Sequence, residues 1–585
     1  MRNLHQQKIK KRTILLTSFF ILWVGGLVFR LVQLQIFHHP RLEDEVMEQN
    51  QFKKTITPKR GTIYDLKGNI LARSLPRKSV FYTPSNTQTP SQQFQKVLKL
   101  RRILNLSSEE VQKIRTRIQK KDPFIWIKRK VTPETAQKVK QMDIDRIHFM
   151  EENKRFYPHR SLGAQLLGRV NIDEEGQSGV ELAYNEVLEG EKGLHLVLRD
   201  ARKKDYRFQT LKQPVEGKDL ILTVDETIQY IAEKELEKTV QKFKANWGTV
   251  VVSRPSTGEI LAMANYPRFD LNHPPSNLSK LLRSDRNKAI HHTFNPGSTF
   301  KIITASAALE SHRVNPSDSF DCSKGYIRCS GNIIRDHKKM GILSFPEVII
   351  HSSNVGAVKI GRNTGEKILY QTIKSFGFGE KTGIDLPAEE KGIFRSLPHW
   401  SKVSLNYLSI GYEISVTALQ MLQAINTIAN KGECPTPHVL KKILPSSEQA
   451  YSIPSKYQRV ISENTAGKLC NILHKVVQKG TGQAARIRGY SAAGKTGTAQ
   501  KYDPSLGTYT SSSHTASFIG FVPVHKPAIS MVVVVDGPQG TYYGGKVAAP
   551  LFQRIAVQVL HYMHIPPRKE SQVFIASKNR EQPKQ

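Results

Sequence analysis

An unbroken apolar run near the N-terminus constrains this chain more than any other feature. Residues 13–29 read TILLTSFFILWVGGLVF without a charge, and residues 31–37 continue the apolar character beyond Arg30. A membrane-spanning helix needs about 20 mostly apolar residues, whereas the apolar core of a cleaved signal peptide has about 7–15. No A-x-A-like cleavage site follows the run. We therefore expect an uncleaved transmembrane anchor over residues 13–37.

The charges beside the anchor predict its orientation. Basic residues near a span stay on the cytoplasmic side of the membrane. Those that precede this run are Arg2, Lys8, Lys10, Lys11 and Arg12. The prediction is a single-pass membrane protein, with residues 1–12 in the cytoplasm and the bulk of the chain outside the membrane. Arg30 can extend its head group to the far interface.

The net charge narrows the class of partner. Lys and Arg number 87 and Asp and Glu number 50, which gives +37 at pH 7. Such an excess favours nucleic acid, acidic lipid head groups or an anionic polymer. Nucleic acid is excluded as an expected partner, because no recognition motif is present and the bulk of the chain faces outward. The membrane surface and an anionic wall polymer remain.

The chain is too long for one hydrophobic core, since it has 585 residues. We expect a cytoplasmic tail at 1–12, the anchor at 13–37, a non-catalytic pedestal at 38–218, a catalytic domain at 219–565 and a polar tail at 566–585. Within the pedestal, we predict a helical stalk at 38–56, a strand, turn and strand around Lys67-Gly68-Asn69, basic helices at 91–145 and a linker at 199–218.

Strands at both ends of the catalytic domain indicate its fold class. A hairpin is predicted at 248–264, after a helix at 227–242 and before a series of helices. The run AISMVVVV at 528–535 is typical of a buried strand, and residues 549–561 form a closing helix in this interpretation. This order of elements predicts an α/β or α+β fold built on one sheet.

The four cysteines exclude a disulfide scaffold and make a zinc site improbable, because no C-x-x-C pair occurs. Cys322 and Cys329 flank Gly325 and Tyr326, which suit a reversing turn. An oxidising compartment permits a disulfide between them. Two separate thiols are the alternative, and the sequence leaves both open.

The first candidate for chemistry is Ser298 with Lys301, the only S-x-x-K pair in the chain. The segment NPGSTFKII at 295–303 suits a turn that enters a helix. A serine at the N-terminal end of a helix lies where developing negative charge is stabilised. Lys301 lies one turn further on the same face, so an amine is beside the hydroxyl and, with a lowered pKa, it can take the proton. The alternative is a capped helix with an unrelated surface lysine.

The second candidate is an S-x-N motif, a pattern that occurs five times. Ser352-Ser353-Asn354 stands out because it lies between two apolar helical stretches, 345–350 and 355–360. That placement predicts a short rigid loop between helix ends. The other four motifs lie in polar or loop-like segments.

The third candidate is one of two K-T-G motifs. Lys495-Thr496-Gly497-Thr498 follows a run of small residues, which predicts a strand edge that a substrate backbone can approach closely. The other motif, at 381–383, runs into IDLP, a turn-like sequence, and we assign it to structure.

Together these motifs resemble the signature of the penicillin-binding proteins and class A β-lactamases. The chain is similar to a class B, monofunctional, high-molecular-weight penicillin-binding protein over almost its whole length. The resemblance includes the anchor and the segments RGTIYD at 60–65, GVE at 179–181, RNKA at 286–289 and GYEISVT at 411–417. The middle residue of the S-x-N motif is Ser353, where the signature has Asp. No glycosyltransferase-like N-terminal half is present, unlike in the bifunctional class A proteins.

The resemblance implies a peptidoglycan D,D-transpeptidase that cross-links stem peptides through a serine acyl-enzyme, closer to the division (FtsI) branch than to the elongation branch. It implies a mainly antiparallel sheet with helices on both faces. It also implies a place in the cell inner membrane, with the N-terminal helix in the membrane and the catalytic domain in the periplasm. Possible carboxypeptidase activity follows from the same chemistry. The implied partners are stem peptides ending in D-Ala-D-Ala, β-lactams, a glycosyltransferase and divisome membrane proteins. No metal or organic cofactor is needed.

The resemblance also implies a role for each motif residue. Ser298 is the nucleophile, Lys301 the base for acylation, Ser352 a proton relay and Asn354 a ligand of the substrate amide. Lys495 supplies positive charge, and Thr496, Gly497 and Thr498 form the strand that binds the terminal carboxylate. The backbone N–H groups of Ser298 and Thr498 form the oxyanion hole.

Three other functions compete with this interpretation. The chain could be an elongation-type transpeptidase. It could be a catalytically idle scaffold or penicillin sensor, although the complete set of motifs argues against that. It could be a β-lactamase, for which the anchor and the pedestal are superfluous.

Overall fold

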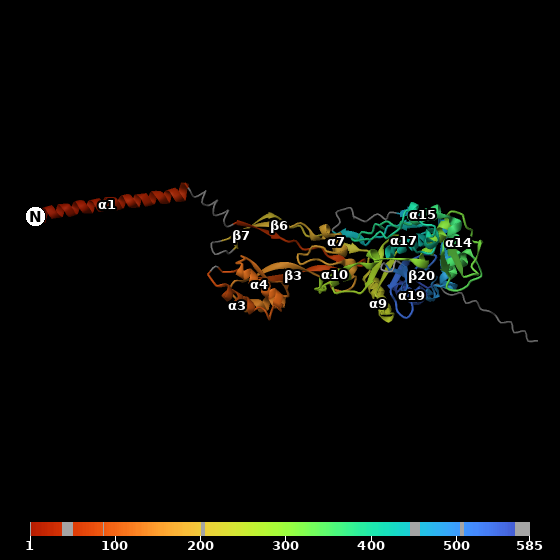
Figure 1. Ribbon diagram of the computed structural model, residues 1–585. Coiled ribbons are helices and arrows are strands. Elements are labelled where there is room, and N and C mark those ends of the chain that lie inside the picture. The colour runs from red at the N-terminus through yellow and green to blue at the C-terminus, as the bar shows by residue number, and fades with distance from the viewer. Residues whose placement is uncertain are drawn as a thin grey trace, which may run out of the picture. The chain divides into compact units, whose positions relative to one another are not determined.

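The computed structural model describes residues 2–37, 51–85, 87–199, 205–444, 457–503 and 508–567. The chain divides into two compact units. One comprises Met1–Lys59 with Gly190–Gly217, and the other comprises Arg60–Glu189 with Lys218–Gln585. Figure 1 shows the elements of both.

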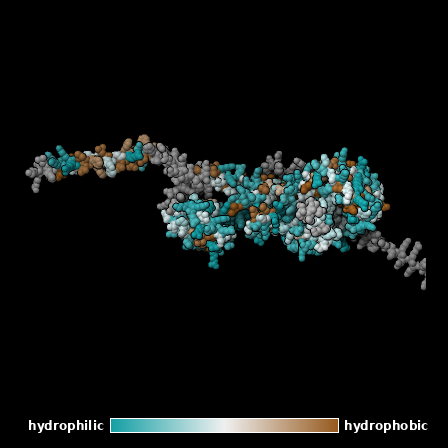
Figure 2. All heavy atoms as spheres, viewed as in Figure 1, coloured by the Kyte–Doolittle hydropathy of each residue, from teal (hydrophilic) through white to brown (hydrophobic). Residues whose placement is uncertain are grey.

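The first unit begins with α1 (Arg2–Val32), which continues as a π-helical turn (Gln33–Phe37). The helical segment Gln7–Phe37 has a mean hydropathy of 2.1 over its most apolar window, and none of that window is buried within the protein. It is long and apolar enough to cross a membrane. Brown, apolar spheres cover much of its surface in Figure 2. This finding is consistent with the anchor expected at 13–37.

The rest of the first unit is an antiparallel sheet in the order β1-β6-β7, with β1 (Gln51–Ile56), β6 (Gly193–Arg199) and β7 (Asp205–Lys212). The expected helical stalk is therefore wrong at 51–56, and residues 38–50 lie outside the described residues. The expected linker at 199–218 is also wrong, because it contains β7. Local patterns missed this sheet because β1 pairs with a strand about 140 residues away.

The pedestal part of the second unit packs helices against a sheet. α3 (Pro90–Leu98), α4 (Ser108–Gln119) and α5 (Pro133–Gln141) are capped by Thr89, Ser107 and Thr132, and the last two caps were expected. The sheet has the order β18-β8-β2-β3-β4, with β5 (Ile147–Phe156) beside β3. β4 (Ile125–Val131) interrupts the region expected to be helical, because its alternate residues Ile125 and Ile127 enter the core.

The expected turn at Lys67-Gly68-Asn69 joins β2 (Ile63–Tyr64) to β3 (Ile70–Tyr82), and Gly68 takes a φ of 89° that favours glycine. β2 also pairs in parallel with β8 (Asp219–Leu222), which pairs with β18 (Leu440–Leu444). Through these pairings, one sheet joins the pedestal strand β2 to β8 and β18, which belong to the region expected to be catalytic.

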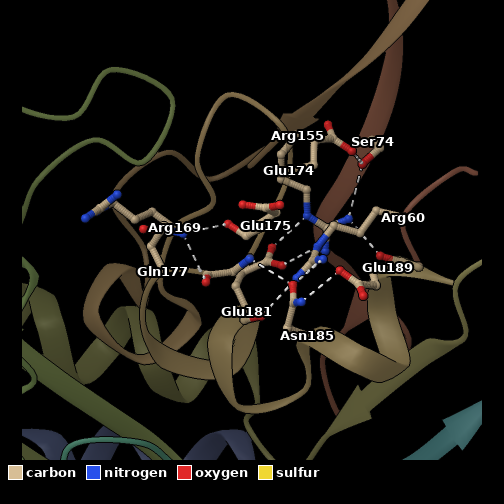
Figure 3. Close-up of polar contacts among 12 residues, drawn as sticks. Arg60, Ser74, Arg155, Arg169, Glu174, Glu175, Gln177, Glu181, Asn185 and Glu189 are labelled. Atoms are coloured by element: carbon tan, nitrogen blue, oxygen red, sulfur yellow. Dashed lines mark hydrogen bonds and ion pairs between the residues drawn. The ribbon is translucent and has the colours of Figure 1, made fainter. Parts of the chain in front are cut away.

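A buried ion cluster joins three distant segments of this unit (Figure 3). Arg60 and Arg155 each place Nε on one oxygen of the Glu181 carboxylate, at 2.8 and 2.6 Å. Arg60 also donates to Asn185 Oδ1 and Arg155 donates to the Gly61 carbonyl. All three charged side chains are almost fully buried. The segments RGTIYD and GVE, which support the family resemblance, therefore meet here.

The catalytic region is built on a five-stranded antiparallel sheet in the order β10-β9-β22-β21-β20. Its strands are β9 (Trp247–Ser253), β10 (Ile260–Tyr266), β20 (Ala493–Asp503), β21 (Thr508–Val522) and β22 (Ile529–Asp536). The expected hairpin and buried strand are confirmed. β20 lies at one edge of the sheet.

Helices cover both faces of this sheet, as expected. α9 (Glu226–Lys242) and α19 (Gly544–Tyr562) pack on the face that carries Val533 and Val535. α17 (Ala418–Ala429) and most of α18 (Glu463–Lys479) pack on the face that carries Val532 and Val534. α19 begins five residues before the expected 549, because the Gly544 N–H finds an acceptor in β20.

Shorter elements complete this unit. Its other helices are α6 (Ala164–Leu167), α7 (Gly179–Ala183), α8 (Asn185–Glu189), α10 (Leu278–Asp285), α11 (Lys288–His291), α12 (Lys301–Glu310), α13 (Phe345–His351), α14 (Asn354–Thr364), α15 (Glu366–Ser375) and α16 (Ser404–Leu408). Its other strands form the pairs β11 (Thr293–Phe294) with β16 (Val416–Thr417), β12 (Ser319–Asp321) with β15 (Ile342–Ser344), β13 (Tyr326–Cys329) with β14 (Asn332–Arg335), and β17 (Glu433–Pro435) with β19 (Tyr457–Arg459).

Cys322 and Cys329 are free thiols with different partners. Cys322 Sγ lies 3.4 Å from Ser353 Oγ, and the Arg362 guanidinium donates to Cys329 Sγ at 3.4 Å. Of the two alternatives that the sequence left open, the structure has the separate thiols.

Candidate active site

Ser298 lies in a single 3₁₀ turn, η2 (Gly297–Phe300), that leads directly into α12. Gly297 has a φ of 53° and its N–H donates to the Gly411 carbonyl at 3.0 Å, which fixes the entry into the turn. Ser298 is half-buried, and its hydroxyl makes no hydrogen bond to any residue that the structure describes. The hydroxyl is therefore available to a ligand.

Lys301 is fully buried one turn beyond Ser298. Its Nζ donates to the Ser352 carbonyl and to Asn354 Oδ1, both at 2.7 Å, and lies 3.3 Å from Ser352 Oγ. Burial lowers the pKa of Lys301 to about 7, although the nearby Asp336 carboxylate opposes this shift. Lys301 and Ser298 share the η2–α12 junction but are not hydrogen-bonded to each other.

The predicted loop between α13 and α14 holds the S-x-N residues. Ser352 ends α13 with a φ of 61°, an unusual value for serine, and this turn brings both its carbonyl and its hydroxyl toward Lys301. Asn354 begins α14, and its side chain donates through Nδ2 to the Arg335 carbonyl at 2.9 Å. Because Oδ1 accepts from Lys301, both ends of the Asn354 amide are held.

Ser353, to which the sequence interpretation gave no chemical role, stabilises this loop through its buried side chain. Its side chain is buried, and its Oγ accepts from the Gly356 N–H at 2.9 Å as the N-cap of α14. The same hydroxyl donates to Asp336 Oδ2 at 2.8 Å. Ser353 therefore connects the start of α14 to a carboxylate from another segment.

That carboxylate, Asp336, was missed by sequence reasoning. Its Oδ1 accepts the backbone N–H groups of Asn354 and, at 3.2 Å, Val355. A negative charge at this position stabilises the N-terminus of α14. The sequence offered no signal, because Asp336 lies among basic residues about 17 positions before the loop it supports.

Lys495 approaches the same site from the edge strand β20. It is fully buried, and its Nζ donates to Ser352 Oγ at 2.8 Å and to the Thr496 carbonyl at 3.2 Å. Burial and the neighbouring Lys301 both lower the pKa of Lys495 well below its ordinary value. The Ser352 hydroxyl thus contacts two buried amines.

Glycines allow η2 to lie directly against β20. A Cβ at Gly497 would lie 2.8 Å from Thr299 Cγ2, 3.0 Å from the Pro296 carbonyl oxygen and 2.3 Å from Ser517 Oγ. A Cβ at Gly297 would lie 3.1 Å from the Thr498 carbonyl oxygen. No side chain fits at either position without displacing its neighbours, so the turn that carries Ser298 and the K-T-G strand are in close contact.

Two threonine hydroxyls of β20 are already oriented. Thr498 Oγ1 accepts the N–H of Gly544, the first residue of α19, at 2.9 Å, which leaves the hydroxyl proton for another acceptor. Thr496 Oγ1 lies 2.8 Å from Thr481 Oγ1. By contrast, the second K-T-G motif, at 381–383, lies in an exposed turn where Thr382 donates to Glu389.

Two family models match this chain, one over its C-terminal half and one over the region that precedes it. The family model described as the penicillin binding protein transpeptidase domain matches residues 248–556. The model described as the penicillin-binding protein dimerisation domain matches residues 55–222.

The similarity to individual proteins extends over almost the full chain. Stage V sporulation protein D of Bacillus subtilis is 34% identical over 94% of this chain and 86% of its own length. The peptidoglycan D,D-transpeptidase FtsI of Escherichia coli K12 is 31% identical over 96% and 94%. The crystal structure of penicillin binding protein 3 from Mycobacterium tuberculosis, complexed with aztreonam, has a TM-score of 0.68 at 26% identity and covers 88% of this chain and 98% of that one.

Proposed function

This chain belongs to the penicillin-binding protein family of peptidoglycan D,D-transpeptidases, and on this basis we propose that Ser298 forms its acyl-enzyme. Ser298 Oγ attacks the carbonyl of the penultimate D-alanine of a stem peptide. The terminal D-alanine leaves as a free amine, and the amine of a second stem peptide then displaces the serine. A β-lactam acylates the same hydroxyl by opening its ring. Water in place of the second amine gives carboxypeptidase activity.

Lys301 is the base in this proposal, and its contacts support that role. A neutral amine has two N–H groups and one lone pair. The Ser352 carbonyl and Asn354 Oδ1, both at 2.7 Å, provide an acceptor for each N–H group. The lone pair is then free to take a proton, and the lowered pKa of Lys301, about 7, keeps a large fraction of the amine neutral near neutral pH.

Ser352 transfers a proton toward the departing D-alanine in the proposed mechanism. Its hydroxyl lies 3.3 Å from Lys301 Nζ and 2.8 Å from Lys495 Nζ. A hydroxyl can accept a proton from one neighbour while it donates its own to another. Asn354 binds the substrate amide, because it stands at the same loop with both ends of its side chain oriented.

The terminal carboxylate binds to Lys495, Thr496 and Thr498 in this proposal. The carboxylate favours the charged form of Lys495, so its binding should add a proton to an amine whose pKa is lowered in the empty site. Thr498 contributes its hydroxyl proton, since Gly544 already occupies an acceptor position on its oxygen.

The backbone N–H groups of Ser298 and Thr498 form the proposed oxyanion hole. The Thr498 carbonyl faces Gly297, on the outer edge of β20. In a strand, the N–H and the carbonyl of one residue point to the same side, so the Thr498 N–H also points toward η2. Such preorganised donors stabilise the tetrahedral intermediate.

We further propose septal wall synthesis as the setting, with residues 1–12 in the cytoplasm, a pedestal over 38–218 that contacts a glycosyltransferase and divisome membrane proteins, and catalysis by residues 219–565. Relatives named FtsI support the division role, although the relative named for sporulation is of similar identity. The basic flank of the span supports the orientation.

The observation that carries the catalytic proposal is the convergence of two buried lysines on Ser352, one of which lies one turn beyond Ser298. The experiment is covalent labelling by fluorescent penicillin, with the adduct located by mass spectrometry. We expect the label on Ser298, none in Ser298→Ala and very little in Lys301→Ala. Lys381→Ala, in the exposed K-T-G motif, is the control and should label normally.

The outcome also separates the rival functions. An adduct on another residue would overturn the assignment of Ser298. A label that is lost by hydrolysis within seconds would indicate a β-lactamase, and no label on a folded protein would indicate an idle scaffold.

A further inference from the structure

A strongly basic surface element borders the site on the side of Asn354. We name residues 322–341, which contain the β13–β14 hairpin and its flanking loops, the basic flap. Its exposed cationic residues are Lys324, Arg328, Arg335, Lys338 and Lys339. None of these side chains forms an ion pair with a residue in the described part of the chain. Asp336, the single acidic residue of the flap, is turned toward the start of α14.

The basic flap is tied directly to catalytic residues. The Arg335 carbonyl accepts from Asn354 Nδ2 at 2.9 Å, and the Asp336 carboxylate holds Ser353. His337, the next residue, is exposed, and its pKa is lowered first by partial burial and then by the charges of Lys338, Lys301 and His351.

Backbone hydrogen bonds fix the base of the flap, and two of its cations, Arg335 and Lys339, pack against neighbouring residues. The Asp336 N–H donates to the Gly325 carbonyl, and the Cys322 N–H donates to the Gly341 carbonyl, both at 2.9 Å. Lys339 packs on Gly325, where an added Cβ would lie 3.0 Å from its Cγ. The Arg335 guanidinium lies over the Tyr326 ring, 5.8 Å from its centroid.

The terminal carboxylate of the substrate does not account for these charges. In the proposed mechanism that carboxylate binds Lys495 on β20, whereas the flap contacts the site through Asn354. The peptide bound to Asn354 continues upstream, away from its D-Ala-D-Ala end. A substrate group beside Arg335 and Lys338 therefore belongs to an upstream residue, and unpaired cations there favour an anion.

We propose that the basic flap binds a second carboxylate of the stem peptide, on a residue upstream of the D-Ala-D-Ala end. This inference rests on the proposed function, because it takes the direction of the peptide from the roles of Lys495 and Asn354. The flap thereby selects stem peptides with a free side-chain or α-carboxylate over peptides in which that group is an amide. The contacts are exposed, so they weaken as salt rises.

The test compares two thioester donors that mimic the stem peptide and differ only in one upstream group, a carboxylate or its amide. The rate constant kcat/KM for acylation of the full-length protein in detergent is measured with each. The test variant carries Arg335→Gln and Lys338→Gln. The matched control carries Arg115→Gln and Lys113→Gln on α4, which removes the same charge and, like the flap, includes an arginine over an aromatic ring.

We expect the wild type and the control to prefer the carboxylate donor about three- to tenfold at low ionic strength, as two exposed ion pairs allow. The flap variant should show a preference close to one. Equal rates in the wild type, or an unchanged preference in the flap variant, overturn the inference.

Penicillin labelling of Ser298 in the wild type is measured in parallel. It distinguishes failure of the inference about the flap from failure of the proposed function. If Ser298 is labelled but neither donor is preferred, only the inference fails. If Ser298 is not labelled, the proposed function fails. Should the double variant not fold, Lys338→Gln alone is compared with Lys113→Gln alone, and the same outcomes apply.

Discussion

Lys301 and Lys495 approach one hydroxyl, that of Ser352, from buried positions at 3.3 and 2.8 Å. Burial lowers the pKa values of both amines, and the charge of Lys301 lowers the pKa of Lys495 further. In the mechanism that we propose, Lys301 must be neutral to act as a base, and Lys495 must become charged to bind a carboxylate. The pH dependence of acylation therefore reports on this pair.

We predict that penicillin labelling becomes faster as the pH rises through about 7. The base must be deprotonated, and a pKa of about 7 leaves about a tenth of Lys301 neutral at pH 6. The rate at pH 6 should be about a tenth of the plateau value reached above about pH 8. Rapid-mixing measurements across this range give the profile. A rate that does not change between pH 6 and 8 would contradict Lys301 as the base.

Ser353→Ala should slow labelling, although the sequence interpretation gave this side chain no chemical role. The substitution removes the N-cap of α14 and one hydrogen bond of Asp336, two of the contacts that position the loop at Asn354. Loss of a cap typically costs about 1 kcal/mol of stability. We expect labelling to fall about tenfold, the effect of about 1.4 kcal/mol on a barrier.

Ser462→Ala is the matched control, because Ser462 caps α18 through the Thr465 N–H in the same way. It should lower the free energy of unfolding by a similar amount while labelling stays normal. Equal labelling rates in the two variants would show that the cap of α14 has no special effect on the site.

At the scale of elements, the site depends on the contact between the η2 turn and the edge strand β20. Gly497→Ala should reduce labelling at least tenfold, since the new Cβ would meet Ser517 Oγ at 2.3 Å and Thr299 Cγ2 at 2.8 Å. The turn and the strand must then separate, which displaces Ser298 from the proposed oxyanion hole. Penicillin labelling and the midpoint of denaturant unfolding are both measured.

Gly467→Ala provides the control for this change. Gly467 lies within α18, and a Cβ there meets nothing within 4 Å. Alanine in a helix is more stable than glycine by about 0.5–1 kcal/mol, so this variant should be slightly stabilised and fully active. Normal labelling of Gly497→Ala would show that the contact tolerates a side chain.

Elements with strong local patterns could be predicted from the sequence. The β9–β10 hairpin, the all-apolar strand β22 and the capped helices α4 and α5 each carry their signal within a few residues. The sheet β1-β6-β7 could not, because its strands find their partners at long range. β4 was missed because only three apolar residues precede its run Lys128-Arg129-Lys130, inside a region that is otherwise helical.

The residues of the candidate site also divide into those that a local sequence pattern predicts and those that only the fold brings to the site. The residues in motifs were found because S-x-x-K, S-x-N and K-T-G fix residue types at short spacing, and the structure brings Lys301, Ser352, Asn354 and Lys495 into one hydrogen-bonded group. Asp336 and the Gly544 N–H were missed, because each reaches the site only through the fold. No spacing in the sequence relates Gly544 to Thr498, which lies 46 residues earlier.

At the scale of the whole molecule, the cluster of Arg60, Arg155 and Glu181 should dominate the stability of the second unit. Glu181→Ala leaves two buried guanidinium groups without their carboxylate, a change that typically costs about 3–5 kcal/mol. Denaturant unfolding measures the loss. Glu191→Ala, which removes an exposed partner of Lys212, is the control and should change stability by less than about 1 kcal/mol. Similar small losses in both variants would contradict the role of the cluster.

The proposed topology also has a direct test. Protease added to spheroplasts should digest the bulk of the chain and leave only a small membrane-bound fragment that contains the helical segment Gln7–Phe37. A tag at the N-terminus should be protected, because residues 1–12 are proposed to be cytoplasmic. A full-length band that survives an active protease would show that the bulk is not outside.

The close contact at Gly297 and Gly497 also limits how such a protein can evolve under antibiotic selection. Neither position can gain a side chain without moving the turn that holds Ser298 away from β20. A mutation there that hinders the drug should also hinder the natural reaction. We therefore expect the substitutions that make such a protein resistant to spare both glycines.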